Sequence, residues 1–331
     1  MRVLGTVIVA IIIGGSAPGQ TLVGTGYDDP SLIAIAPGQV VPLVLTGLTT
    51  VLPAGTVRAQ QIPLPTSQEG ISVTLNQPPA YTRALPLIAI DQFNHCTDST
   101  NPTPDCLVTA ITVQIPFDIL IPNPLIEAPV SAPQITSLVV AENGSVTKSF
   151  TVSPVPDQIH VLQSCDIGGQ TEGSGVCFPI VTHGDGSLVL QAPRAPGQPA
   201  LSNSEARPSE ELVVYAYGLG QVSPAVQAGS ASPNPPAVVT APIYLQFDYR
   251  PNASASMPIL NSSLTTTAQP VFAGLVPGQV GLYQINFVVP PPPAGTSVCG
   301  APVESNLTVS ISAADGQSFS GAAICVDTGS Q

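Results

Sequence analysis

Residues Gly70–Asn76 have the sequence GISVTLN, in which apolar Ile71, Val73 and Leu75 alternate with polar side chains. Alternation with a period of two is typical of a β-strand that buries one face. Runs of this kind, four to eight residues long, recur between turn residues, and the chain shows no amphipathic helical pattern. The sequence therefore predicts an all-β protein built from antiparallel β-sandwiches.

Four such segments occur twice in the same order, at an offset of about 171 residues. The pairs are Ala36–Leu48 with Arg207–Leu219, Gly70–Asn76 with Pro242–Asp248, Ile111–Leu120 with Leu282–Pro290, and Ser137–Phe150 with Thr308–Gly321. An ordered repeat indicates two copies of one domain. We therefore expect two tandem immunoglobulin-like β-sandwich domains, residues 20–156 and 206–331. Between them, residues 157–205 are expected to form a disulfide-closed connector and the opening strand of the second domain.

Turn residues are spread through the whole chain. The 38 prolines and 29 glycines disfavour long helices and favour short strands joined by tight turns. Asn143-Gly144 and Asp315-Gly316 each lie between two strand-like runs and predict a hairpin at the end of each copy. Hydrophobic residues make up 44% of the chain, which is enough to build a packed core instead of a disordered chain.

Charged residues are scarce and mostly acidic. Seven Lys and Arg oppose 20 Asp and Glu, which gives a net charge of −13, and Lys148 is the one lysine. Nucleic acids and anionic membrane surfaces attract proteins that present a basic face. The composition therefore disfavours both as partners.

The N-terminus has the pattern of a signal peptide. Arg2 precedes an apolar run from Val3 to Ile13 and then small residues, which predicts a signal peptide over residues 1–19 with Gln20 as the first mature residue. The apolar run is too short to span a bilayer. We expect a secreted or cell-surface protein with no membrane insertion after cleavage.

Six cysteines in an exported chain predict three disulfides. Local loop closure favours Cys96 with Cys106, Cys165 with Cys177, and Cys299 with Cys325. A zinc site is disfavoured because no CxxC spacing occurs and only His95 beside Cys96 resembles a ligand pair.

Three segments together resemble the C-terminal module of a group of uncharacterised exported proteins of acidobacteria, a module similar to IPT/TIG immunoglobulin-like domains. They are HGDGSLVL at His183–Leu190, EELVVYAYGLGQVSPAVQAGSASP at Glu210–Pro233, and PVFAGLVPGQVGLYQINFVVP at Pro270–Pro290. The first copy, with IAPGQVVPLVLTGL and AITVQIPFDI, resembles the half that precedes that module. The resemblance covers nearly the whole mature chain and implies export and an immunoglobulin-like architecture. It implies no catalytic residue, and the insertion Asp91–Cys106 and the pair Cys299 and Cys325 depart from its pattern.

Catalytic patterns are weak. The histidines His95, His160 and His183 lie beside loop or turn residues without a GxSxG nucleophile elbow, which favours solvated histidines over a hydrolase triad. A glycosidase with two carboxylates among Asp28, Asp29, Asp91 and Asp118 stays open, but 5% aromatics and no Trp disfavour a sugar cleft. We predict no catalytic residue.

Oxygen ligands gather in one loop that Cys96 and Cys106 would close, namely Asp91, Asn94, Asp98 and Asp105. Their spacing does not match an EF-hand, so a solvated acidic loop is favoured over a calcium site. We therefore predict no cofactor. The tetraproline Pro290–Pro293 is expected to stiffen a strand edge or an interdomain corner instead of recruiting a polyproline-binding partner.

Five tyrosines lie in the second copy, at Tyr215, Tyr217, Tyr244, Tyr249 and Tyr283. Strand alternation places Tyr215 and Tyr217 on one face, and core packing is favoured over a ligand patch. If that face is exposed, these two residues become the candidate ligand contacts.

The sequence favours a non-enzymatic secreted or cell-surface module for adhesion, matrix or protein contact. One alternative is a carbohydrate-binding module that acts on extracellular polysaccharide. Another is an extracellular hydrolase or an accessory domain of one. Self-association through Gln20–Ser31, added as a strand to a neighbour, is a further alternative.

Overall fold

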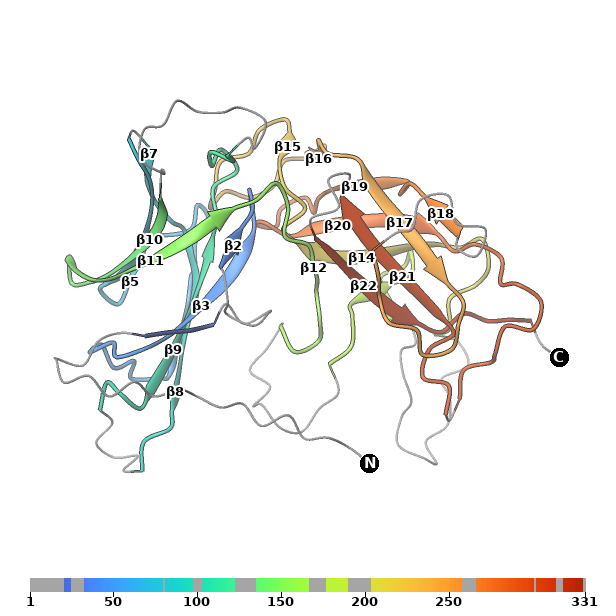
Figure 1. The fold of residues 1–331 in the computed structure, drawn as a ribbon, viewed down its shortest axis with the longest axis horizontal. Helices are drawn as coiled ribbons and strands as arrows, with labels where there is room; N and C mark the ends of the chain where they lie inside the picture. The colour runs from blue at the N-terminus through green and yellow to red at the C-terminus, as the bar shows by residue number, and fades with distance from the viewer. Residues whose placement is uncertain are drawn as a thin grey trace.

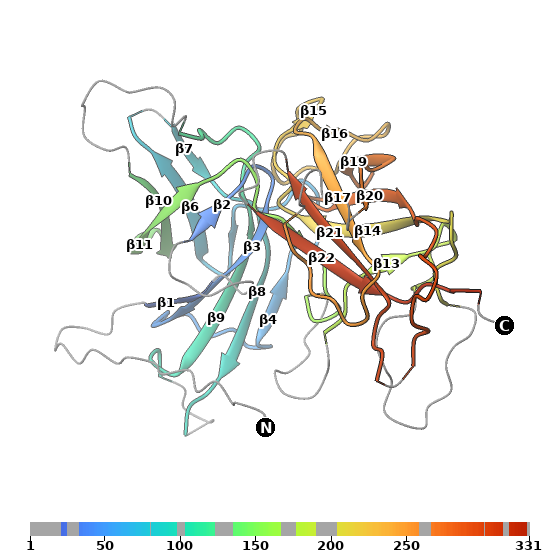
Figure 2. The same cartoon turned by 45° about the vertical axis from the view of Figure 1, so that its right-hand side comes forward.

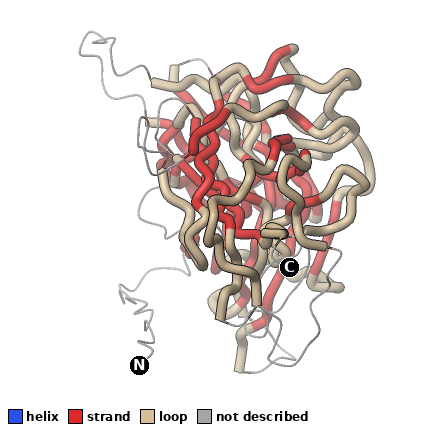
Figure 3. The backbone as a smooth tube through the Cα atoms, turned by 90° about the vertical axis from the view of Figure 1, so that its right-hand side faces the viewer, coloured by secondary structure: helices blue, strands red, loops and turns tan. Residues whose placement is uncertain are grey.

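The computed structural model describes residues 21–24, 33–79, 81–97, 103–122, 135–166, 177–189, 204–257, 266–300, 302–313 and 318–329. Within these ranges every regular element is a β-strand (Figure 3). The strands form four sheets that pack in pairs as two sandwiches, which lie side by side (Figures 1 and 2). The all-β sandwich architecture predicted from the alternating runs is confirmed. The expected signal peptide, residues 1–19, lies outside the described residues.

The first sandwich pairs a five-stranded sheet, in the order β1-β3-β9-β8-β4, with a six-stranded sheet, β2-β11-β10-β6-β5, in which β7 also pairs with β6. Its strands are β1 (Thr21–Gly24), β2 (Ala34–Ile35), β3 (Val40–Thr46), β4 (Thr56–Arg58), β5 (Ser67–Gln68), β6 (Ile71–Gln77), β7 (Tyr81–Ala84), β8 (Leu87–Asn94), β9 (Leu107–Gln114), β10 (Thr136–Glu142) and β11 (Ser145–Pro154). As the alternation predicts, Ile71, Val73 and Leu75 are fully buried in its core.

The second sandwich pairs a seven-stranded sheet, β12-β14-β20-β19-β16-β15 with β13 also on β14, with a four-stranded sheet, β18-β17-β21-β22. Its strands are β12 (His160–Val161), β13 (Val181–Thr182), β14 (Glu211–Tyr217), β15 (Val222–Ser223), β16 (Val238–Val239), β17 (Ile243–Asp248), β18 (Thr266–Ala268), β19 (Phe272–Leu275), β20 (Tyr283–Val288), β21 (Leu307–Ala313) and β22 (Phe319–Ile324). Tyr283 and Phe287 are the largest fully buried side chains of its separate core.

The two sandwiches share an order of strand pairing. In the first, β9 lies between β3 and β8, and β10 lies between β6 and β11; in the second, β20 lies between β14 and β19, and β21 lies between β17 and β22. The strands β12 and β13, from the expected connector, both pair with β14. The internal repeat of about 171 residues and the domain boundaries stay predictions.

The hairpin turn predicted at Asn143-Gly144 is confirmed. Both residues have positive φ, 50° and 79°, and β10 and β11 pair antiparallel on either side of them. A tight two-residue turn requires this left-handed backbone, which Asn and Gly adopt readily. The corresponding Asp315-Gly316 lies outside the described residues, between β21 and β22, which also pair antiparallel.

Three disulfides close local loops. They join Cys96 to Cys106, Cys165 to Cys177, and Cys299 to Cys325, at sequence separations of 10, 12 and 26 residues. These are the pairs that sequence proximity favours. No cysteine of the described residues is left free.

Candidate functional site: a cleft between the sandwiches

Gly229 of the second sandwich is held by the first sandwich through both of its main-chain groups. Its N–H donates to Oε1 of Gln114 at 2.6 Å, and its carbonyl accepts from the N–H of Leu64 at 2.8 Å. Gln114, the last residue of β9, is buried, so this amide has no alternative water partner. Gly229 is thereby fixed relative to two separate segments of the first sandwich.

A second close approach involves Gly281, which precedes β20 and has φ +66°. A Cβ added there would lie 2.7 Å from Cγ2 of Val40 and 2.9 Å from Nε2 of Gln114. Only glycine allows two backbones and a buried amide to approach this closely.

Aromatic side chains complete the junction. Phe117, in the loop after β9, is buried and belongs to the core of the second sandwich although its segment comes from the first. The Tyr283 hydroxyl donates to the carbonyl of Gly220 at 2.5 Å and approaches the carbonyl of Pro37 at 3.4 Å. Hydrogen bonds and apolar packing thus join the two sandwiches into one unit.

Beside this junction lies a cleft of about 700 Å³, within the size range of ligand sites and in a position where such sites often occur. Most of its lining is apolar, with three prolines that offer no N–H donor. The first sandwich contributes Pro63, Leu64, Thr66, Arg83, Ala84, Pro86, Pro116, Phe117 and Asp118; the second contributes Gln221, Val222, Ala225, Val226, Gln227 and Ala228.

The two charged side chains that line the cleft, Arg83 and Asp118, have opposite charges and lie close together. Nη2 of Arg83 lies 3.9 Å from Oδ2 of Asp118, and the Tyr81 hydroxyl donates to Oδ1 of Asp118 at 2.8 Å. The guanidinium of Arg83 also stacks 4.8 Å from the centre of the Tyr81 ring. Burial and the bond to Asp118 raise the pKa of Tyr81 above its ordinary value, so this hydroxyl remains a neutral donor. The described residues that line the cleft include no histidine and no cysteine.

Tyr215 and Tyr217 do not enter the core, contrary to the favoured expectation. The inward residues of β14 are Leu212, Val214 and Ala216, and the two tyrosines lie half-buried on the opposite face. Burial and the nearby carboxylate of Asp166 raise the pKa of Tyr217 to about 12. Core packing holds instead for Tyr283 and, in part, for Tyr249.

Tyr215 belongs to a row of aromatic and amide side chains on the outer face of the seven-stranded sheet. It lies opposite Gln284, whose Nε2 donates to Oδ1 of Asn286 at 3.2 Å, and Asn286 in turn donates to Glu211 at 2.9 Å. The Phe272 ring packs over Gly274, where an added Cβ would lie 2.5 Å from its Cζ. We call this set the outer strip: Glu211, Tyr215, Phe272, Gln284 and Asn286.

The histidines are engaged with loop groups. Nε2 of His160 lies 2.8 Å from Asp166, and His183 lies 2.7 Å from Glu210 through Nδ1 and 3.3 Å from the Ser204 carbonyl through Nε2. The first contact joins β12 to the turn at Asp166, and the second joins the residue after β13 to the residue before β14. His95 is exposed and directly follows β8, and its main-chain N–H donates to the Cys106 carbonyl at 3.1 Å.

The oxygen groups considered for a calcium site are engaged separately where the structure describes them. Asp91 pairs with Arg58 at 3.5 Å and accepts from the Thr56 hydroxyl, and Asn94 accepts from the Cys96 N–H at 2.8 Å. No group of three acidic, histidine or cysteine side chains in the described part of the chain is arranged to hold a metal ion. Asp98, Asp28 and Asp29 lie outside those residues.

The tetraproline follows β20, where the Pro290 carbonyl accepts a hydrogen bond from the Tyr249 hydroxyl. Of the two described carboxylates considered for a glycosidase, Asp91 and Asp118, it is Asp118 that lines the cleft.

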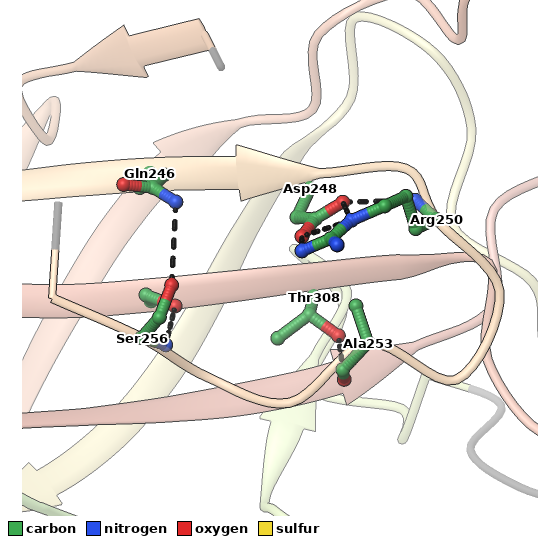
Figure 4. Close-up of polar contacts among 7 residues, drawn as sticks. Gln246, Asp248, Arg250, Ala253, Ser256 and Thr308 are labelled. Carbon is green, nitrogen blue, oxygen red and sulfur yellow. Dashed lines mark hydrogen bonds and ion pairs between the residues drawn. The ribbon is translucent and has the colours of Figure 1, made fainter. Parts of the chain in front are cut away.

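A polar face of the four-stranded sheet is covered by the protein itself (Figure 4). The segment that follows β17 crosses this face, where the Thr308 hydroxyl donates to the Ala253 carbonyl at 2.7 Å and the Ser256 N–H donates to Ser310 at 2.8 Å. Arg250 holds Asp248 through both carboxylate oxygens, which keeps the pKa of that carboxyl below its ordinary value. These groups satisfy each other, so this face is structural.

Sequence reasoning did not find the cleft, although it singled out Asp118. The walls come from four separate segments, and none carries a catalytic or ligand-binding motif. The signals that bear on the site are the left-handed glycines Gly229 and Gly281 and the buried Gln114, and these become informative only once the sandwiches are docked.

No protein-family model matches the chain, and no curated protein matches it. A solved structure of the Yersinia pseudotuberculosis adhesin InvE is similar, with 11% sequence identity and a TM-score of 0.18 over 95% of this chain. The match spans 62% of that adhesin chain. A TM-score this low carries no argument about fold or function. Among the described residues, no helix is long and apolar enough to cross a membrane.

Proposed function

We propose that this chain is an exported, non-enzymatic binding module that holds an extracellular ligand in the cleft between its two sandwiches. The observation that carries the proposal is the cleft itself, a space of about 700 Å³ with apolar walls and a few polar groups at its rim. Its walls are preorganised, because Gln114, Leu64 and Gly229 fix the two sandwiches against each other. A preformed site loses little conformational entropy on binding.

Export is supported by the three disulfides, which persist in oxidising compartments, and by the signal-peptide pattern of residues 1–19. Membership in the exported acidobacterial group with an IPT/TIG-like module is part of the same proposal. It rests on the segments His183–Leu190, Glu210–Pro233 and Pro270–Pro290.

The test is a binding screen of the purified, oxidised protein against extracellular proteins and polysaccharides. Ala225 is exposed and lines the cleft, so Ala225→Trp fills the site with little strain on the fold. Ala54→Trp, at an exposed turn of the first sandwich outside the cleft, is the matched control. We expect a ligand whose retention is lost with Ala225→Trp and kept with Ala54→Trp. Equal retention by both variants would remove the cleft as the binding site.

A carbohydrate-binding module is the second candidate, favoured by the outer strip. Aromatic rings beside amide groups suit the C–H faces and hydroxyls of a sugar chain. The strip contains no cation, which suits an uncharged polysaccharide. If this function operates, Tyr215→Ala and Phe272→Ala each weaken retention on an insoluble polysaccharide, whereas Phe319→Ala, exposed on the other sheet, does not.

A further inference from the structure

Strand β7 presents an unpaired edge to the cleft. Among the described strands, β7 pairs only with β6, and Ala84 at its end lines the cleft. The Leu85 N–H donates to the Val73 carbonyl at 2.8 Å, and the register places Arg83 opposite Leu75. Main-chain groups of an antiparallel strand alternate in direction. The main-chain N–H and C=O of Arg83 therefore face β6, whereas those of Thr82 and Ala84 point away from β6.

The edge of β7 is protected only in part against pairing with another strand. Edge strands are commonly guarded by short length, charged side chains, prolines or bulges. Here β7 has four residues, with Pro79 and Pro86 just beyond its ends, and Nη1 of Arg83 donates to the Thr82 carbonyl at 3.3 Å. The Arg83 side chain is 55% exposed and lies toward Asp118. The next residue, Ala84, carries only a methyl group. The main-chain groups of Ala84 therefore open directly onto the cleft.

The remaining cleft walls complement an extended chain. Pro63, Leu64 and Pro86 flank the β7 side, and Val222 and Val226 lie across from them on the second sandwich. Because these prolines lack N–H donors, the outward-facing main-chain groups that β7 offers in the cleft are those of Ala84. A strand laid along β7 would bond to it through its main chain and pack side chains against these apolar walls.

We propose that the cleft binds an extended segment of a partner polypeptide, which adds to β7 as a new strand. The strand β7 has four residues, so the segment it pairs with spans roughly 13 Å. The opposed charges of Arg83 and Asp118 at the rim favour a segment that is close to neutral. This inference rests on the proposed function and specifies its ligand class as polypeptide.

The experiment begins by panning a phage library of random linear peptides against the oxidised protein and synthesising the most enriched peptide. Its affinity is then measured for the unaltered protein and for Ala225→Trp and Ala54→Trp. We expect Ala225→Trp to weaken binding by about tenfold or more, because it occupies the apolar space, and Ala54→Trp to leave it unchanged.

Two further measurements test strand addition itself. Ala84→Pro removes the N–H that points away from β6, and proline is tolerated at such edge positions, so we expect about tenfold weaker binding with the fold retained. Ala84→Ser changes the side chain but keeps this N–H, and we expect it to bind as the unaltered protein does. In the peptide, N-methylation should weaken binding at alternate positions only, since every second amide of an added strand faces β7.

The inference fails if panning enriches no peptide that depends on the cleft, if N-methylation acts equally at all positions, or if Ala84→Pro binds like Ala84→Ser. The proposed function has a separate readout. If another ligand is lost with Ala225→Trp while peptides do not bind, the cleft function stands and the polypeptide assignment falls. If no ligand responds to Ala225→Trp, both fall.

Discussion

The side-chain oxygen of Gln114 accepts a hydrogen bond from the backbone N–H of Gly229 at 2.6 Å, across the junction between the two sandwiches. The two residues are separated by 115 positions in the chain. Gly229 directly follows Ala228, which lines the cleft, so the stability of the junction and the shape of the cleft depend on the same amide.

We predict that Gln114→Leu destabilises the protein. The substitution keeps the side chain of similar size but leaves the Gly229 N–H buried without its partner, which typically costs about 1–3 kcal/mol. The measurement is the midpoint of urea denaturation followed by circular dichroism. Gln60→Leu, at an exposed position, is the control and should not lower the midpoint. Equal midpoints for the two variants would contradict a structural role for the Gln114 amide.

Gly281→Ala and Gly278→Ala should differ in their effect on stability. Both glycines have left-handed backbones, with φ +66° and +77°, so both variants lose about 1 kcal/mol from backbone strain. A Cβ at Gly278 meets nothing within 4 Å, whereas at Gly281 it collides with Val40 and the Gln114 amide. Gly281→Ala should therefore be less stable than Gly278→Ala by a further 1–3 kcal/mol, roughly. Thermal melts of the two variants measure this difference, and identical melting temperatures would contradict close approach at the junction.

Removal of the Cys299–Cys325 disulfide should destabilise the second sandwich. The bond closes a loop with a sequence separation of 26, and loss of such a constraint on the unfolded chain typically costs about 3 kcal/mol. The double variant Cys299→Ser with Cys325→Ser should therefore denature at lower urea than the oxidised protein. Replacing Cys96 and Cys106, at a separation of 10, should cost less. A larger loss from the Cys96 and Cys106 replacement would contradict this order.

Stability should fall above pH 10 because buried tyrosines resist ionisation. Burial raises the pKa of Tyr217 to about 12, and those of Tyr81, Tyr249 and Tyr283 are raised further. In the unfolded chain tyrosine titrates near pH 10, so the folded state holds these protons more tightly. Their contribution to stability is complete below pH 10 and is lost as the pH rises from 10 through each folded-state pKa, which is about 12 for Tyr217 and higher for the other three.

Tyrosinate absorbance at 295 nm during an alkaline titration provides the measurement. Of seven tyrosines, these four should ionise late, together with a loss of β-sheet circular dichroism. Ionisation of all seven near pH 10 with the fold intact would contradict the burial of Tyr217 and Tyr283.

Local features of this protein were predictable from the sequence. The alternation in Gly70–Asn76 sets a half-buried strand, and the Asn143-Gly144 pair sets a left-handed turn, because each depends on neighbouring residues alone. Local loop closure likewise favours the pairing of Cys96 with Cys106.

Sequence alternation placed Tyr215 and Tyr217 on one face but did not determine which face meets the core. Both faces of β14 carry apolar residues, and only the packing of Leu212, Val214 and Ala216 inside the second sandwich turns the tyrosines outward. The cleft depends on tertiary structure in the same way. Gln114, Leu64 and Gly229 are far apart in the chain and meet only when the sandwiches dock. The sequence by itself therefore determined the strands, turns and disulfide loops, which follow from local periodicity and short closures. Tertiary structure alone decided the cleft and its open strand edge, because long-range packing between two separate cores creates them.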